Sequence, residues 1–187
     1  MNEEQQPPKV FISYSHDNSE HKRWVTEFAS RLVKNGIDVI LDQWDLNLGD
    51  DVPKFMERSV RNADRVLMIC TEPYVHKAND GKGGVGYEAM IVTGELVRDL
   101  GTSKFIPVIR QKGSIPVLPT SVCTRFYIDL SNEEIFDEQF KTLLRELHQI
   151  PEIEKPPIGK NPFARLPSGN EIPDAVTITE PDTVIKG

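Results

Sequence analysis

Short apolar runs of strand length alternate along the chain with longer stretches in which apolar residues recur every three or four positions. This alternation is typical of an α/β domain built on a parallel sheet. The apolar runs predict strands at residues 9–13, 37–42, 65–70, 104–110 and 126–130. The helical stretches predict helices at residues 19–35, 52–62, 85–100 and 132–150. Gly36 is placed to end the first helix, and Asp50 or Asp51 is expected to cap the second.

The order of these elements restricts how the sheet can be assembled. Crossovers between parallel strands are right-handed, which favours a flavodoxin-like five-stranded parallel sheet in the order 2-1-3-4-5 with helices on both faces. In such sheets the ligand crevice lies beyond the carboxyl ends of the strands, where the winding direction reverses. Here that point lies between strands one and three, and the loops 14–18, 43–51 and 71–84 converge on it. Residues 71–84 lack periodicity, so a mobile loop is predicted there.

The flanking segments differ in composition from the predicted domain, residues 9–150. Residues 1–8 are polar, and residues 151–187 contain seven of the chain's prolines, at positions 151, 156, 157, 162, 167, 173 and 181. Few aromatic residues accompany these prolines, so the segment is predicted to be a linker or a disordered end and not a second domain.

Charge and cysteine content narrow the function classes. The formal net charge is −7, and Lys and Arg form no cluster, which argues against a nucleic-acid or anionic-membrane surface. The two cysteines, Cys70 and Cys123, show neither a disulfide pattern nor zinc-ligand spacing. No apolar run approaches the ~20 residues that span a bilayer. We therefore expect a cytoplasmic protein without a metal site or direct nucleic-acid or membrane partners.

One carboxylate stands out by its position. In residues 81–96, GKGGVGYEAMIVTGEL, Glu88 lies where a glycine-rich loop passes into the helix predicted at 85–100. A glutamate there can simply meet the positive end of the helix dipole. Alternatively, it can be held rigidly in the crevice while the loop closes over a substrate. The glycines match neither the phosphate-loop nor the dinucleotide-binding pattern, so no nucleoside triphosphate site is expected.

Three segments carry a resemblance to a known family. They are F-I-S-Y-S-H at residues 11–16, L-D-Q-W-D-L with the following G-D-D-V-P at residues 41–53, and the strand that ends at Cys70. They resemble the Toll/interleukin-1 receptor (TIR) domain, and more closely its bacterial and SEFIR members, over residues 9–150.

The resemblance implies two alternative functions. Animal TIR receptors and adaptors act mainly as assembly modules, whereas many bacterial and plant members cleave NAD+ into nicotinamide and ADP-ribose or its cyclic isomer. Their catalytic glutamate begins the helix after the third strand, and the matching position here is Glu88. Many enzymatic members have Trp four residues before it, where this chain has Gly84, and Tyr87 is a possible substitute. The resemblance thus implies an NAD+ glycohydrolase or cyclase activated by self-assembly, with NAD+ as substrate and no cofactor, that serves in bacterial immunity or interferes with host signalling.

The other candidate substrate-binding residues lie at the ends of strands one and two. Ser13 and Tyr14 leave strand one, where they can contact the nicotinamide ribose or ring. Asp42, Trp44 and Asp45 line the second loop, and Trp44 either stacks on a base or packs the loop.

The competing hypothesis is a non-enzymatic scaffold. In family members the second loop docks into a neighbouring domain, and such head-to-tail contacts build open assemblies. Here that loop carries Trp44, Leu46 and Leu48 among acidic residues, which suits TIR–TIR self-association and a fused or separate sensor or effector. A nucleoside deoxyribosyltransferase-like enzyme shares the sheet order and is the third alternative. His16 and His76 are expected to be solvated.

Overall fold

The structure is a computed structural model that describes residues 6–80, 102–113 and 115–161. Its strands are β1 (Lys9–Ser13), β2 (Asp38–Ile40), β3 (Arg65–Cys70), β4 (Phe105–Ile109) and β5 (Ile128–Asp129). They form one five-stranded parallel sheet in the order β2-β1-β3-β4-β5. The predicted strand order and the α/β fold class are therefore confirmed.

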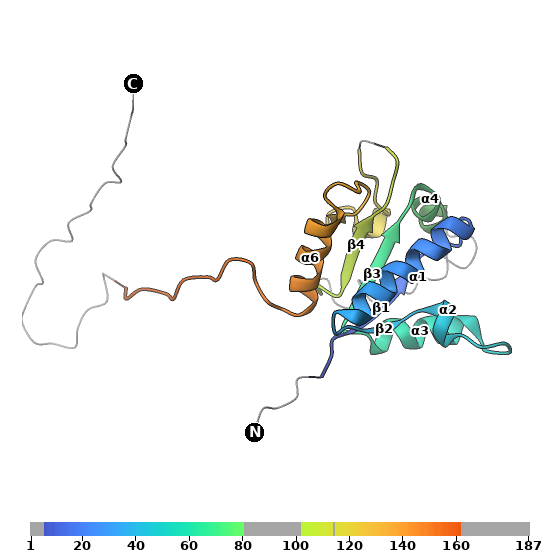
Figure 1. The fold of residues 1–187 in the computed structure, drawn as a ribbon, viewed down its shortest axis with the longest axis horizontal. Coiled ribbons are helices and arrows are strands. Elements are labelled where there is room, and N and C mark those ends of the chain that lie inside the picture. The colour runs from blue at the N-terminus through green and yellow to red at the C-terminus, as the bar shows by residue number, and fades with distance from the viewer. Residues whose placement is uncertain (1–5, 81–101, 114, 162–187) are drawn as a thin grey trace, which may run out of the picture. The chain divides into compact units, whose positions relative to one another are not determined.

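The described helices lie on both faces of this sheet (Figure 1). They are α1 (Ser19–Lys34), α2 (Asp42–Asp45), α3 (Val52–Asn62), α4 (Glu72–Asp80) and α6 (Phe136–Leu147), with a short 3₁₀ turn at Thr120–Val122. The helix predicted at residues 85–100 lies outside the described residues.

Successive residues of each strand point to opposite faces of the sheet and pack into two separate hydrophobic cores. On one face α1 and α6 cover the sheet, and Phe28 of α1 meets Phe140 of α6 with ring centroids 5.9 Å apart. On the other face α3 and α4 pack on residues of β1, β3 and β4, with Phe11 of β1 against Phe55 of α3. Because both faces are covered, the strands read as continuous apolar runs, and polar groups are left at the strand ends.

Local signals fix the ends of α1 and α3 as the sequence predicts. The Asn18 side chain accepts a hydrogen bond from the His21 backbone N–H at 2.8 Å, and Gly36, at φ 82°, follows the last turn of α1. Asp51 caps α3 by accepting from the Lys54 backbone N–H at 3.1 Å, and Pro53 occupies its first turn.

The predicted mobile loop at 71–84 is wrong over its first part, because residues 72–80 form α4. The Thr71 hydroxyl accepts a hydrogen bond from the Tyr74 backbone N–H at 3.2 Å, which caps this helix. Tyr74 and Val75 are buried in the core on the α3 side. Only two of the nine residues of α4 are buried, and two adjacent buried positions are too few to be recognised as helical periodicity.

Other element boundaries also differ from the prediction, among them those of β5, which spans Ile128–Asp129 and not residues 126–130. β2 ends at Ile40, and the loop predicted at 43–51 begins with α2, in which the Asp45 carboxylate accepts from the Leu41 backbone N–H at 2.8 Å. α6 begins at Phe136 and not at residue 132. The Asn132 side chain accepts from the Glu134 backbone N–H at 2.9 Å, a local turn that competes with a helical start.

The last described residues belong to a second unit of the chain. Contacts divide the chain into the unit Met1–Ile153 and the unit Glu154–Gly187. Residues 154–161 form neither helix nor strand and are exposed.

The burial of β3 generates a prediction about stability. Leu67 lies in this central strand with no exposed area. We expect Leu67→Ala to lower the free energy of unfolding by about 2–5 kcal/mol, because it removes transfer energy and leaves a cavity. Leu48→Ala, at a fully exposed position, should change it by less than about 0.5 kcal/mol. Urea unfolding measures both, and equal effects would contradict the assignment of Leu67 to the core.

Candidate functional site

Three chain segments meet at the carboxyl ends of β1, β2 and β3. Residues 14–17 follow β1, α2 follows β2, and α4 follows β3. Side-chain hydrogen bonds join the first segment to the other two, from Tyr14 to Asp42 and from Thr71 to Asp17. This is the edge at which parallel sheets bind ligands, between the strands where the winding reverses.

A network of hydroxyl groups and one carboxylate links β1 to β3 at this edge. The Ser13 hydroxyl lies 2.9 Å from the phenol oxygen of Tyr74, and both residues are buried. The Thr71 hydroxyl donates to Asp17 Oδ2 at 2.6 Å, and the Ser15 hydroxyl donates to Asp17 Oδ1. The Asp17 side chain is only 8% exposed. Its buried charge is stabilised by these donors, which tie the loop after β1 to the start of α4.

A second group of contacts joins the same loop to α2. The Tyr14 hydroxyl donates to Asp42 Oδ1 at 2.9 Å, and His16 Nε2 lies 2.7 Å from Asp42 Oδ2. The Asp42 carboxylate therefore bonds to the side chains of both Tyr14 and His16. The His16 side chain is more than half exposed. The hydroxyls of Ser13 and Tyr14 both take part in hydrogen bonds within the protein.

The remaining candidates on the second loop point elsewhere. Asp45 bonds the Leu41 backbone at the start of α2. Trp44 borders an apolar groove of about 420 Å³ beside the edge strand β2, together with Val33 and Val39. Leu46 packs against the core on the α3 side, and Leu48 is fully exposed. The position of Trp44 favours packing or assembly over stacking on a base in the crevice.

Glu88 and Tyr87 lie outside the described residues. The structure follows the chain to the end of α4 at Asp80, eight positions before Glu88. The predicted roles of both residues therefore stay predictions.

Sequence reasoning missed a cluster of Arg110, His21 and Trp24 on the α1 side of this edge. Arg110 follows β4 and donates from Nη1 to His21 Nδ1 at 3.0 Å, and its guanidinium lies 4.7 Å from the centre of the Trp24 ring. Because arginine can only donate, His21 Nδ1 is the acceptor, and the imidazole proton is on Nε2. His21 is 1% exposed, and Nε2 has no hydrogen-bond partner among the described residues.

The environment of His21 keeps the imidazole neutral. Burial lowers the pKa of His21 from its ordinary value of 6.5; Asp17 opposes this shift, while the charges of Arg110 and His16 reinforce it. The only sequence signal for this cluster was the apolar spacing of α1, in which a buried histidine is easily overlooked.

The two cysteines are unpaired and differ in their exposure. Burial raises the pKa of the Cys70 thiol to about 12, so it stays protonated at neutral pH, and Cys123 is exposed. Within the described ranges, no three His, Cys, Asp or Glu side chains gather in a metal-binding arrangement. None of the helices in this part of the chain is both long and apolar enough to cross a bilayer.

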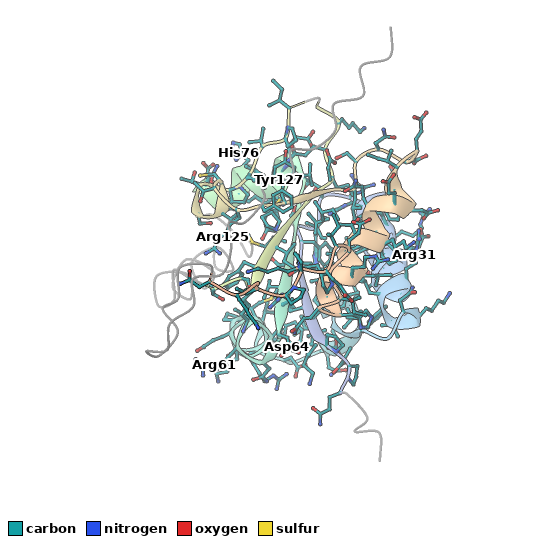
Figure 2. All side chains as sticks on the ribbon, turned by 90° about the vertical axis from the view of Figure 1, so that its left-hand side faces the viewer. Arg31, Arg61, Asp64, His76, Arg125 and Tyr127 are labelled. Atoms are coloured by element: carbon teal, nitrogen blue, oxygen red, sulfur yellow. The ribbon has the colours of Figure 1, made fainter. Side chains whose placement is uncertain are left out.

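A separate pocket lies at the opposite edge of the sheet. It has a volume of about 650 Å³ and is bordered by β4, the segment before β5, and the last turns of α6. Arg125 and Tyr127 belong to its lining and project beside β5 (Figure 2). Phe126 between them is fully exposed. The pocket is lined by both apolar and charged side chains and is distinct from the carboxyl edge.

Comparison with known families decides the assignment. The family model described as TIR domain matches residues 10–144. The chain belongs to the TIR domain family. This confirms the resemblance found in the sequence and sets aside a nucleoside deoxyribosyltransferase. A comparison with curated proteins returns no match.

Solved structures agree with this assignment. A prokaryotic SEFIR domain is 40% identical, with a TM-score of 0.66, and the match covers 81% of this chain and 99% of that one. The TIR domain of the Toll-related receptor TRR-2 from Hydra magnipapillata is 16% identical, with a TM-score of 0.54 and coverage of 74% and 97%. The SEFIR domain of interleukin-17 receptor B is 13% identical, with a TM-score of 0.53 and coverage of 76% and 98%. The last two show the shared TIR fold alone.

The state of His21 leads to a pH prediction for this TIR domain. The lowered pKa means that the folded protein binds this proton less readily than the unfolded chain. The free energy of unfolding should therefore fall as the pH drops below about 6.5, the ordinary pKa of histidine. We expect His21→Gln, whose amide oxygen can still accept from Arg110, to flatten this fall between about pH 7 and 5.

Urea unfolding at several pH values measures the effect. His76→Gln is the control, since His76 on α4, labelled in Figure 2, is largely exposed and forms an ion pair with Asp80 at 3.1 Å. Identical pH slopes for wild type and His21→Gln would refute a buried neutral imidazole.

Proposed function

We propose that this TIR domain is an NAD+ glycohydrolase or cyclase that cleaves the bond between nicotinamide and ribose. The observation that carries the proposal is the polar carboxyl edge built from β1, α2 and the start of α4. From that edge the chain runs through α4 toward Glu88, the position that matches the family's catalytic glutamate. The proposal includes a role in bacterial immunity, which the family resemblance implies, and a prokaryotic SEFIR domain is 40% identical to this chain.

The chemistry requires only one carboxylate. Ordinary glycosidases use two, because a sugar alkoxide is a poor leaving group and must be protonated. In NAD+ the C1′–N bond breaks with its electron pair passing to the pyridinium ring, and nicotinamide leaves as a neutral molecule. The enzyme has mainly to stabilise the positive charge that builds on the ribose. An ionised Glu88 facing that charge, and accepting from the ribose hydroxyls, favours the transition state over the ground state.

The two products differ in the nucleophile that completes the reaction. In hydrolysis a water molecule adds to C1′ and loses a proton, which gives ADP-ribose. In cyclisation a ring nitrogen of the adenine adds instead, which gives cyclic ADP-ribose. Water exclusion from the crevice decides between them.

The described residues at the carboxyl edge support this reaction by holding the sides of the crevice in place. Asp42 holds Tyr14 and His16 on one side, and Asp17 and Thr71 join the other side to α4. Such a bonded frame limits the movement of groups that face the substrate, which a positioned glycosidic bond requires. Ser13 and Tyr14 line the ribose end of the crevice in this proposal, and Tyr87 takes the place of the missing aromatic at Gly84.

The decisive experiment replaces Glu88. Glu88→Gln keeps the size of the side chain but removes its charge, so nicotinamide release from NAD+ should fall by roughly 10²–10³-fold or more. Glu133→Gln, on an exposed turn, is the control and should retain wild-type turnover. Chromatography of the products measures nicotinamide, ADP-ribose and cyclic ADP-ribose, and thermal unfolding confirms that both variants fold. Full activity of Glu88→Gln would move the site elsewhere.

A second function, homotypic assembly, is favoured by the exposure of the α2–α3 connection. Leu48 is fully exposed there, and Trp44, on the adjoining helix α2, is 43% exposed beside the groove along β2. Exposed apolar side chains on one surface commonly mark a protein interface. The pocket at the β5 edge, with exposed Phe126, is a different surface. Contact between two different surfaces of successive copies builds an open assembly. Such an assembly can activate the enzyme, or act alone as a scaffold that receives a sensor or effector.

Substitutions in this connection test assembly. Trp44→Ala and Leu48→Ala should each weaken self-association, because they remove exposed apolar area without disturbing the core. If assembly activates the enzyme, nicotinamide release per molecule should fall in parallel. Analytical ultracentrifugation over a concentration series, with NAD+ turnover at the same concentrations, measures both effects.

Ile158→Ala is the control, since Ile158 is exposed but lies beyond the described sheet and helices. Self-association that survives both loop substitutions would exclude this connection as the interface. Loss of self-association with full turnover would separate assembly from catalysis.

A further inference from the structure

His16 and Asp42 form a hydrogen-bonded pair of side chains on the carboxyl edge. His16 Nε2 lies 2.7 Å from Asp42 Oδ2. The Asp42 side chain is 10% exposed, whereas the His16 side chain is 55% exposed. A nearly buried carboxylate therefore holds an imidazole that solvent can reach.

The other contacts of Asp42 determine which nitrogen of His16 carries the proton. Asp42 Oδ1 accepts from the Tyr14 hydroxyl at 2.9 Å and from the Gln43 backbone N–H at 2.7 Å, so Oδ2 is the oxygen that meets the imidazole. An ionised carboxylate only accepts hydrogen bonds, so His16 Nε2 carries a proton. In the neutral imidazole the lone pair is then on Nδ1. Nδ1 has no hydrogen-bond partner among the described residues.

This arrangement has the parts of a general base. In a histidine–aspartate pair the carboxylate fixes the tautomer and the orientation of the ring, and it stabilises the imidazolium that forms when the second nitrogen takes up a proton. The ring centroids of His16 and Tyr14 are 5.0 Å apart, and both side chains bond to Asp42. The proposed function places Tyr14 at the ribose end of the crevice. On that placement the imidazole lies beside the ribose, where a water molecule must give up a proton.

We propose that His16 is the general base of the hydrolytic half of the reaction. This inference rests on the proposed function. After the C1′–N bond has broken with its electron pair passing to nicotinamide, the oxygen of a water molecule forms a bond to C1′. One proton of that water passes to His16 Nδ1, and the charge of Asp42 stabilises the imidazolium. The imidazolium then releases the proton to solvent, which leaves ADP-ribose and the original enzyme.

Only one of the competing nucleophiles needs this base. Water loses a proton when it adds to C1′. A ring nitrogen of the adenine, or of an added pyridine, adds through its lone pair and has no proton to lose in that step. Removal of the base should therefore slow hydrolysis without slowing cyclisation or exchange with a pyridine. In this proposal His16 sets the ratio of linear ADP-ribose to the other products.

The first test offers both kinds of nucleophile to the variant His16→Gln. The glutamine amide can still donate to Asp42 Oδ2, but it has no basic nitrogen. With NAD+ and 3-acetylpyridine, ADP-ribose formation should fall by about 10²-fold, while the exchanged dinucleotide should form within about twofold of the wild-type rate. Chromatography of the same reaction mixtures measures both products. An equal fall in both products would overturn the proposal, because it would indicate that His16 only maintains the shape of the crevice.

The matched control is His76→Gln. His76 is also exposed and also pairs with an aspartate, Asp80 at 3.1 Å, but both of these residues belong to α4. Its replacement should leave the ratio of ADP-ribose to exchanged dinucleotide at the wild-type value.

Added imidazole tests the proton transfer directly. Because the His16 side chain is more than half exposed, a small base can enter the space that His16→Ala leaves. Imidazole should therefore raise ADP-ribose formation by His16→Ala in proportion to its concentration, with no effect on wild type or on His76→Gln. A loss of ADP-ribose formation that imidazole does not reverse would assign His16 a positioning role and would overturn the proposal.

Nicotinamide release by the wild-type protein separates this inference from the proposed function. If wild type releases nicotinamide and His16→Gln gives the wild-type product ratio, the general base is refuted while the enzyme remains. The same holds if wild type forms cyclic ADP-ribose without ADP-ribose, since no water is then deprotonated. If wild type releases no nicotinamide, the proposed function and the general base both fail. Selective loss of ADP-ribose in His16→Gln, with rescue of His16→Ala by imidazole, would support both.

Discussion

The burial of the parallel sheet on both faces is the constraint from which the rest of this TIR domain follows. Five of the six residues of β3 are buried, and α1 and α6 cover one face while α3 and α4 cover the other. Polar side chains that cannot enter either core are placed where the strands end. Because all strands are parallel, their carboxyl ends share one edge, and the polar groups of β1, β2 and β3 meet there.

Those polar groups are themselves partly buried, so they must bond to one another. Asp17 accepts from Ser15 and Thr71, and Ser13 pairs with Tyr74, so the end of β1 is joined to the first turn of α4. The same bonds that satisfy buried groups therefore set the direction in which the chain leaves β3. The residues around this crevice are held in place by hydrogen bonds that the buried polar groups need for stability. The chemistry of a site there depends on the few groups that extend into the crevice.

The two proposed functions use different surfaces and are compatible. The candidate catalytic edge lies at the carboxyl ends of β1 and β3, whereas Trp44 lies on α2 beside the outer strand β2 and Leu48 lies on the α2–α3 connection. The pocket beside β5 is at the other end of the strand order. Contacts through the outer surfaces leave the edge between β1 and β3 open to a small molecule, so assembly need not block a substrate.

The sequence by itself determined the strand order, the start and end of α1, and the cap of α3, because these depend on local apolar spacing and on side chains within a few residues. It also placed Ser13, Tyr14 and Asp42 at the carboxyl edge. It missed α4, whose buried pattern is short, and the partners of Asp17, since Thr71 is 54 positions away in the chain. Only the tertiary structure decided which polar side chains bond to each other and that Trp44 lies along β2. The pairing of β1 with β3 brings together residues that are far apart in the sequence, and local sequence patterns do not predict such contacts.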